Sequence, residues 1–257
     1  AGDTERMTLL GTWKHGIWLL LCAGLVGSLL TVSLRRHWSR RKAGYVMVGF
    51  CLISEISKMM TGMLPGPGGG MHLDPLNLPF HLCSLMLFVV LFITFGREGR
   101  AKQIAMSFLA VMGTLGSVCA LLIPTNGVDF TDPGAYQCFV YHGALLWFAL
   151  YLIASRQAQL GRKSWLLNLL VLASLSLLML YVNGALSGYD TNFFYLTRPP
   201  MENLPYLNLN HGWYAYFLRL VGLGVGLVTL FHLPFMAAEA RRRKAPAALT
   251  GETVSPR

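Results

Sequence analysis

The sequence predicts an all-α polytopic membrane protein, a bundle of seven transmembrane helices. Of its 257 residues, 54% are hydrophobic and only 12% are charged, which is too few charges to cover the surface of a globular domain. A transmembrane helix needs about 20 apolar residues, and seven segments of the chain qualify. Their apolar residues run continuously and do not alternate with polar ones, which excludes a β-barrel.

The spans follow one another through short connections, which favours a single domain over residues 1–240. In chain order the predicted spans are 16–34, 43–64, 78–95, 104–123, 136–155, 165–187 and 212–238. Basic residues follow the first, third, fifth and seventh of them. The connection at 65–77 is rich in Gly and Pro and is predicted to lack regular structure. The connection at 188–211 combines aromatic residues, Asn and Pro, and its length suits a re-entrant or capping element.

The net charge of +10 comes from basic residues after alternate spans. The basic residues that follow these spans are Arg35, Arg36, Arg40, Arg41, Lys42, Arg97, Arg100, Lys102, Arg156, Arg162, Lys163, Arg241, Arg242, Arg243 and Lys244. The opposite connections carry almost none, Arg198 being the exception. This pattern predicts an outer N-terminus and a cytoplasmic C-terminus with a disordered tail at 241–257. The charge thus indicates topology, and no nucleic-acid partner is expected.

Several polar side chains lie inside the apolar spans, where a charge costs about 2.5–3.5 kcal/mol. These residues are Glu55, Lys58, His81, Cys83, His142, Asn183 and Arg219. With the predicted topology and a rise of about 1.5 Å per residue, they share the outer half of the bilayer. Such a layer predicts one polar pocket that opens to the outer side. Each residue also has a purely structural interpretation, such as mutual neutralisation of Glu55 and Lys58, which are three residues apart on one helical face.

A thiol becomes a nucleophile when a base removes its proton. His142 is the candidate base, and Cys83 lies at a similar depth on another helix. Cys138 is a rival thiol, because it is four residues from His142 and shares a helical face with it. The five cysteines all fall in spans and fit no zinc spacing, although one disulfide between Cys119 and Cys138 stays open.

Three stretches of the sequence resemble one known family. LPFHLCSLMLF (78–88), YHGALL (141–146) and DTNFFYLTRPP (190–200) look like the YwaF family of bacterial integral membrane proteins, which is similar to eukaryotic transmembrane protein 164. The resemblance covers most of the chain, from the second span to the seventh. It implies a multi-pass protein of a bacterial cell membrane. The eukaryotic relative is described as an acyltransferase that moves fatty acyl chains between phospholipids. More distant relatives, hydrolases of fatty acid esters, also look similar in using a nucleophile–His pair.

The resemblance implies that Cys83 is the nucleophile and His142 the base of a membrane-embedded acyltransferase or acyl-ester hydrolase. Its partners would be membrane phospholipids or fatty acyl esters, and no cofactor or metal is expected. The residues expected to orient or bind the substrate are Glu55, Lys58, His81, Asn183, Asn192 and Arg219. The steps would be attack by the thiolate on an ester, a thioester, and transfer to a hydroxyl or to water.

Three other classes stay open from the sequence. The first is a transporter or lipid-binding protein whose outer cavity holds an anion through Arg219 and Lys58. The second is a haem protein with His81 and His142 as axial ligands. The third is a zinc site made by His81, Cys83, His142 and Glu55. A retinal protein is disfavoured, because the seventh span has no lysine.

Overall fold

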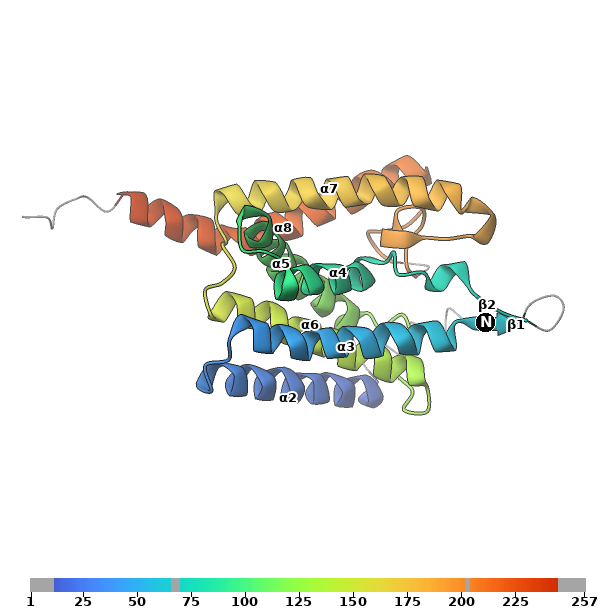
Figure 1. Cartoon of the computed structure of the whole chain (residues 1–257). Coiled ribbons are helices and arrows are strands. Elements are labelled where there is room, and N and C mark those ends of the chain that lie inside the picture. Colours follow the sequence, from blue (N-terminus) through green and yellow to red (C-terminus); the bar gives the residue numbers. More distant parts are fainter. Residues whose placement is uncertain (1–11, 66–69, 202–203, 245–257) are drawn as a thin grey trace, which may run out of the picture.

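The computed structural model describes residues 12–65, 70–201 and 204–244, and its chain is built from seven α-helices (Figure 1). They are α2 (Trp13–Arg35), α3 (Arg40–Thr61), α4 (Leu82–Phe95), α5 (Arg100–Leu122), α6 (Pro133–Ala154), α7 (Arg162–Ala185) and α8 (Gly212–Lys244). All but α4 are long and apolar enough to cross a membrane. The all-α class, the seven helices and the multi-pass membrane character are therefore confirmed.

The third predicted span differs from the structure, because α4 begins only at Leu82 and has 14 residues. Pro79 disfavours helical backbone at the preceding residue, and Leu78 is indeed extended (φ −57°, ψ 147°). His81 is also extended and forms the N-cap. A 14-residue helix spans only about 21 Å, so the irregular chain before it must cover part of the thickness of the membrane.

The connection predicted to be irregular at 65–77 is partly regular. A hairpin of two antiparallel strands, β1 (Met63–Pro65) and β2 (Met71–Leu73), is followed by the 3₁₀ turn η1 (Pro75–Asn77). The prediction was wrong here, because apolar residues beside the Gly- and Pro-rich stretch pair across it, Met63 with Leu73. The hairpin projects from one end of the bundle (Figure 1).

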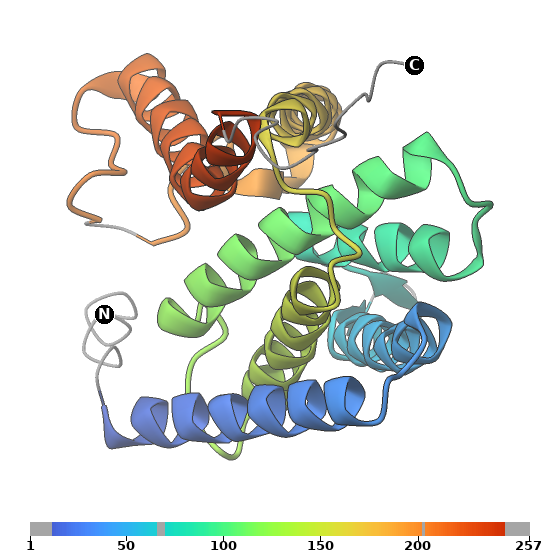
Figure 2. The same cartoon turned by 90° about the vertical axis from the view of Figure 1, so that its left-hand side faces the viewer.

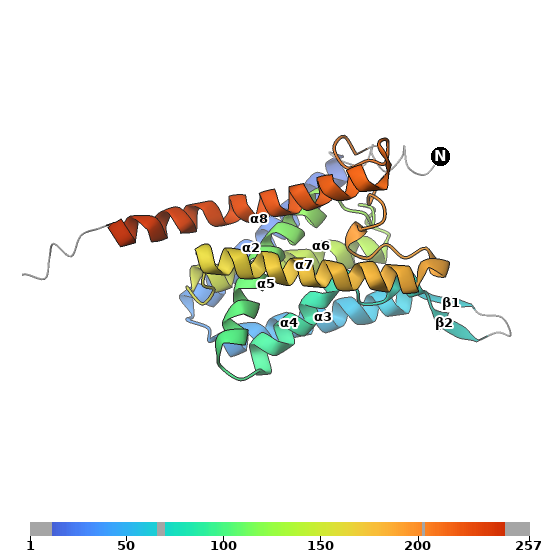
Figure 3. The same cartoon turned by 90° about the horizontal axis from the view of Figure 1, so that it is seen from above.

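The helix α6 lies at the centre and packs on α2, α3 and α5. Its large side chains Trp147, Phe148 and Tyr151 are fully buried. Figure 2 shows α5 crossing obliquely between the α7–α8 pair and the group of α2, α3 and α6. Figure 3 shows that α8 runs along α7 and extends beyond the other helices. Large apolar side chains are exposed on the outer helices, Leu20 on α2 and Leu218 on α8 among them, as a lipid-facing surface requires.

The end of α8 corrects the predicted tail. The helix continues through Lys244, so the first residues of the segment predicted to be disordered are helical. The remainder of the predicted tail, 245–257, lies outside the described residues.

Candidate functional site

Glu55 and Lys58 form a buried ion pair on α3. The Nζ of Lys58 lies 2.7 Å from Oε2 of Glu55, and the two side chains are 17% and 7% exposed, respectively. The geometry is that of an ion pair without an aligned hydrogen bond. Lys58 also donates a hydrogen bond of 2.6 Å to the hydroxyl of Ser84 on α4. The pair therefore neutralises itself and, in addition, ties α3 to the first turn of α4.

Cys83 is the second residue of α4 and is half-buried. The N-cap residue His81 makes no side-chain hydrogen bond to this helix end, so the free N–H groups of the first turn keep their partial positive charge. Lys58 and Glu55 lie within electrostatic range of the thiol. The hydroxyl of Tyr141 on α6 donates a 2.5 Å hydrogen bond to the carbonyl of Cys83 and fixes its backbone. The Lys58 ammonium favours a thiolate at Cys83, whereas burial and the Glu55 carboxylate, which is paired with Lys58, oppose it.

His142 is buried in α6, and its hydrogen bonds are with its own helix. Its Nδ1 lies 2.7 Å from the carbonyl oxygen of Cys138 and 3.7 Å from the sulfur of the same residue. A carbonyl oxygen only accepts, so Nδ1 carries the proton of the neutral ring and Nε2 carries the lone pair. Nε2 has no hydrogen-bond partner among the described residues. The basic nitrogen of His142 is thus the one turned away from Cys138.

The connection between α7 and α8 packs over His81. The amide of Asn183 donates to the carbonyl of Phe193 at 3.0 Å and accepts from its N–H at 2.8 Å. The ring of Phe193, fully buried, packs edge-on against His81 with centroids 5.2 Å apart. Asn192 binds the backbone of Thr197 and Arg198. Both amides are therefore engaged with backbone groups of the connection between α7 and α8.

The structure joins most of the predicted site residues in neighbouring groups but leaves Arg219 apart. The guanidinium of Arg219 contacts Asn208 at 3.3 Å and His211 at 3.2 Å, both in the connection before α8. Its hydrogen bonds are thus separate from those of the Glu55–Lys58 pair. In the part of the chain that is described, no hydrogen bond links Cys83 directly to His142.

The side chain of Tyr195 lies near two thiols, those of Cys83 and Cys138. Its phenol is within electrostatic range of both sulfur atoms. Tyr195 also packs its ring 5.9 Å from that of His81. The backbone at Tyr195 adopts a positive φ of 55°, an uncommon conformation for a residue other than glycine. The backbone of the connection therefore has a left-handed conformation at the residue that lies near the two thiols.

Sequence reasoning missed Ser84, Tyr141 and Tyr195. Each of them lies beside or within a motif that was recognised: Ser84 follows Cys83, Tyr141 precedes His142, and Tyr195 falls in the stretch 190–200. Their polar groups could have been considered with the residues next to them. Their partners could not be found, because sequence spacing does not show how helices are rotated toward each other.

A cavity of about 410 Å³ adjoins the site on the surface between α3 and α6. Its walls are mainly apolar, with Phe50, Ile53 and Val140, and it contains the hydroxyls of Ser54 and Ser57. Tyr141 also lines the cavity, while its hydroxyl contacts the carbonyl of Cys83. This one side chain therefore joins an apolar cavity to the backbone of the predicted nucleophile.

Two of the alternatives that depend on cysteine or metal chemistry do not match the geometry. Cys119 and Cys138 are both free thiols, so the disulfide considered between them is not present. Within the described residues, no three His, Cys, Asp or Glu side chains are close enough together to hold a metal ion. The zinc site considered for Glu55, His81, Cys83 and His142 is therefore not assembled.

Comparison with known proteins agrees with the sequence resemblance. A search of curated proteins and a search of solved structures each gave no match. The model of the TMEM164 family matches residues 9–232, which include all the candidate site residues and all the helices up to most of α8. The match covers far more than half of the chain. The protein therefore belongs to the TMEM164 family.

Proposed function

We propose that the protein is a membrane-embedded lipid acyltransferase, with Cys83 as the nucleophile and His142 as the general base. The observation that carries this proposal is the position of Cys83 in the uncapped first turn of α4, beside the Lys58 ammonium. Both features favour the thiolate, the reactive form of the side chain, against the opposing effects of burial and of the Glu55 carboxylate.

The proposed reaction has two halves. Nε2 of His142 takes the proton of the Cys83 thiol, and the sulfur attacks the carbonyl carbon of a lipid ester. The carbon–oxygen bond breaks, the leaving alkoxide takes the proton from His142, and a thioester remains on Cys83. A hydroxyl of a second lipid then gives its proton to His142 and attacks the thioester, which releases the thiolate. Water in place of that hydroxyl would complete a hydrolysis.

The state of His142 favours Cys83 over Cys138 as the partner. Nδ1 already donates to the carbonyl of Cys138, so this nitrogen cannot accept a proton from the Cys138 thiol next to it. Only Nε2 is free to act as a base. The proposal requires the Cys83 thiol to reach this atom when substrate is bound. In unliganded enzymes, catalytic hydrogen bonds are often long or unformed.

The cavity between α3 and α6 provides a place for an acyl chain. Apolar residues of α3 and α6 line it, together with Tyr141, whose hydroxyl contacts the Cys83 carbonyl. An ester lipid whose chain lay there would hold its carbonyl near the first turn of α4. The partners are accordingly proposed to be phospholipids with fatty acyl esters, in the multi-pass setting of a bacterial cell membrane.

The test is trapping of the thioester by purified protein in liposomes with labelled phospholipid. The wild-type protein and Cys138→Ala should both carry the acyl group on the peptide that contains Cys83, as seen by mass spectrometry. Cys83→Ala should carry none and should lose transfer to a lysolipid acceptor. His142→Gln should slow formation of the thioester by about a hundredfold, the lower range for a general base. Unchanged transfer in Cys83→Ala would overturn the proposal.

A further inference from the structure

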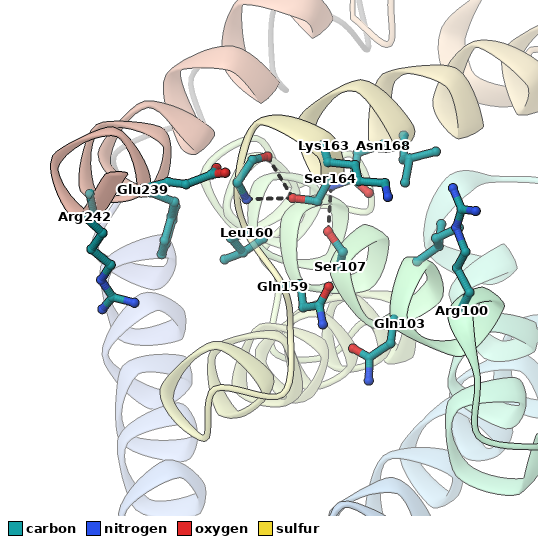
Figure 4. Close-up of a pocket in the computed structure, with 15 residues that line it drawn as sticks. Arg100, Gln103, Ser107, Gln159, Leu160, Lys163, Ser164, Asn168, Glu239 and Arg242 are labelled. Atoms are coloured by element: carbon teal, nitrogen blue, oxygen red, sulfur yellow. Dashed lines mark hydrogen bonds between the residues drawn. The ribbon is translucent and has the colours of Figure 1, made fainter. Parts of the chain in front are cut away.

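A second cavity, of about 520 Å³, is shown in Figure 4. It lies near the start of α5, whereas Cys83 is at the start of α4, the helix before it. It is enclosed by the start of α5, the start of α7, the last part of α8 and the connection before α7. The basic connections that follow α2, α4 and α6 meet at this same end (Figure 1). No step of the proposed acyl transfer uses this cavity.

Its charged lining is mainly cationic. Arg100, Lys163 and Arg242 line it from three different helices, and none of the three has an ion pair or a side-chain hydrogen bond among the described residues. The acidic residue in the lining, Glu239, accepts a 3.1 Å hydrogen bond from the backbone N–H of Arg162 at the start of α7. The carboxylate thus caps a helix, and an excess of positive charge faces the cavity.

Two buried acceptors in the lining have no donor. His232 donates through Nδ1 to the carbonyl of Val228, so its Nε2 accepts from the amide nitrogen of Asn168, at 3.4 Å. The same amide nitrogen donates to Ser107 at 3.1 Å. These bonds fix the orientation of the Asn168 amide and leave its Oδ1 without a partner, although Asn168 is 0% exposed. Oε1 of Gln103 is unpartnered as well.

A ligand for this cavity must therefore supply negative charge and hydrogen-bond donors together. A phosphate diester gives the charge for the cations, and hydroxyl groups give donors for Asn168 and Gln103. The lining also includes the apolar side chains of Leu160, Leu167 and Phe235, which suit the glycerol and first methylenes of a lipid. A free sugar phosphate would leave these apolar residues uncovered.

We propose that the cavity binds the headgroup of an anionic phospholipid that carries hydroxyl groups, of the phosphatidylglycerol kind. The phosphate lies among Arg100, Lys163 and Arg242, and the hydroxyls reach Oδ1 of Asn168 and Oε1 of Gln103. This site is distinct from the proposed acyl-transfer site, because its residues come from the opposite end of the bundle. It binds a lipid whether or not Cys83 is catalytic.

The experiment measures lipid retention by the purified full chain with native mass spectrometry, using three probes. Phosphatidylglycerol carries charge and hydroxyls, phosphatidylmethanol carries the same charge without hydroxyls, and phosphatidylcholine has no net charge. The wild-type protein should retain phosphatidylglycerol about threefold to tenfold better than phosphatidylmethanol, as one or two hydrogen bonds imply. Phosphatidylcholine should be retained least.

Two variants separate the cavity from the general charge of this end. The double variant Lys163→Gln with Arg242→Gln should weaken phosphatidylglycerol binding about tenfold. The control Arg162→Gln with Arg241→Gln removes the same charge from neighbouring positions that do not line the cavity, and it should bind normally. Gln103→Met should reduce the preference for phosphatidylglycerol over phosphatidylmethanol and leave the affinity for phosphatidylmethanol unchanged.

Several results would overturn the proposal. Equal losses in the two double variants would mean that only the general charge attracts lipid. Equal retention of phosphatidylglycerol and phosphatidylmethanol by the wild-type protein would show that the headgroup hydroxyls make no contact with Asn168 and Gln103. Displacement of the lipid by millimolar glycerol 3-phosphate would assign the cavity to a soluble phosphate ester. All three readouts are independent of acyl transfer, so a failure of the proposed function leaves them interpretable.

Discussion

At the scale of single residues, the buried Glu55–Lys58 pair should be sensitive to substitution of either partner. Lys58→Met should destabilise the fold by about 3 kcal/mol, because it leaves the Glu55 carboxylate buried without its countercharge. The free energy of unfolding in mixed micelles, from titration with a denaturing detergent, measures this loss. The double variant Glu55→Gln with Lys58→Met has no buried charge left, and it should recover most of the stability. An equally unstable double variant would contradict the role of the pair.

A second prediction at this scale concerns Asp129, in the connection between α5 and α6. The hydrogen bond from Lys14 on α2 lowers the pKa of the Asp129 carboxyl to about 2, with help from Thr131. A carboxyl whose pKa is depressed in the folded state stabilises that state above its unfolded pKa, near 3.8. This contribution is lost as the pH falls through about 2.

The corresponding variant is Asp129→Asn, compared with the wild-type protein by thermal unfolding across pH. The wild-type protein should melt at the higher temperature at pH 6, and the difference should shrink between pH 4 and pH 2. The exposed position of the pair makes the effect small and sensitive to salt. A difference that stays constant over this range would show that the ion pair does not contribute.

At this scale, only part of the candidate site could be predicted from the sequence. Position along a helix follows from counting residues, so Glu55, Cys83 and His142 could be placed near one end of the bundle. Rotation about the helix axis does not follow from counting. The contacts of Lys58 with Ser84, and of Tyr141 with Cys83, depend on that rotation and needed the structure. The contacts of Arg219 with Asn208 and His211 also needed the structure.

At the scale of elements, α3 and α4 approach closely at Gly44. A Cβ added to Gly44 would lie 2.4 Å from the hydroxyl oxygen of Thr94 on α4. Gly44→Ala should therefore destabilise the protein by about 1–3 kcal/mol, as overpacking of a filled interface does. Gly49→Ala is the matched control on the same helix, because nothing lies within 4 Å of its added Cβ. It should leave the stability unchanged or increase it slightly.

Unfolding of the two variants in the same micelles gives the comparison. A Gly44→Ala protein as stable as Gly49→Ala would mean that α3 and α4 separate without loss. The packing is relevant to function, since α3 carries Lys58 and α4 carries Cys83. A shift between these helices would change the distance from the ammonium to the thiol.

The elements themselves were largely predictable, and the exceptions have physical causes. Long apolar runs fix the existence of a transmembrane helix, which explains the agreement for α2, α3, α5, α6, α7 and α8. The start of α4 was placed too early, because hydropathy does not register the effect of Pro79 on the backbone. The hairpin of β1 and β2 was not predicted, because strands of three residues are too short to show a recognisable alternation of apolar and polar residues.

At the scale of the whole molecule, the basic residues give the bundle one charged end. The connections α2–α3, α4–α5 and α6–α7 and the end of α8 lie together there (Figure 1). The positive-inside rule assigns this end to the cytoplasm. Cys83, at the start of α4, and the connection over His81 belong to the opposite end. The predicted orientation therefore places the proposed acyl-transfer site in the outer leaflet and the proposed headgroup site in the inner leaflet.

Labelling with a membrane-impermeant maleimide tests this orientation in intact cells. Asn210→Cys, exposed in the connection before α8, should react before the membrane is permeabilised. Arg97→Cys, exposed between α4 and α5, should react only afterwards. The unsubstituted protein gives the background from the native cysteines. The reverse pattern would contradict the positive-inside assignment and move the Cys83 site to the inner leaflet. The ester carbonyls that it could reach would then be those of cytoplasmic-leaflet lipids, so orientation decides which pool of phospholipid is the substrate.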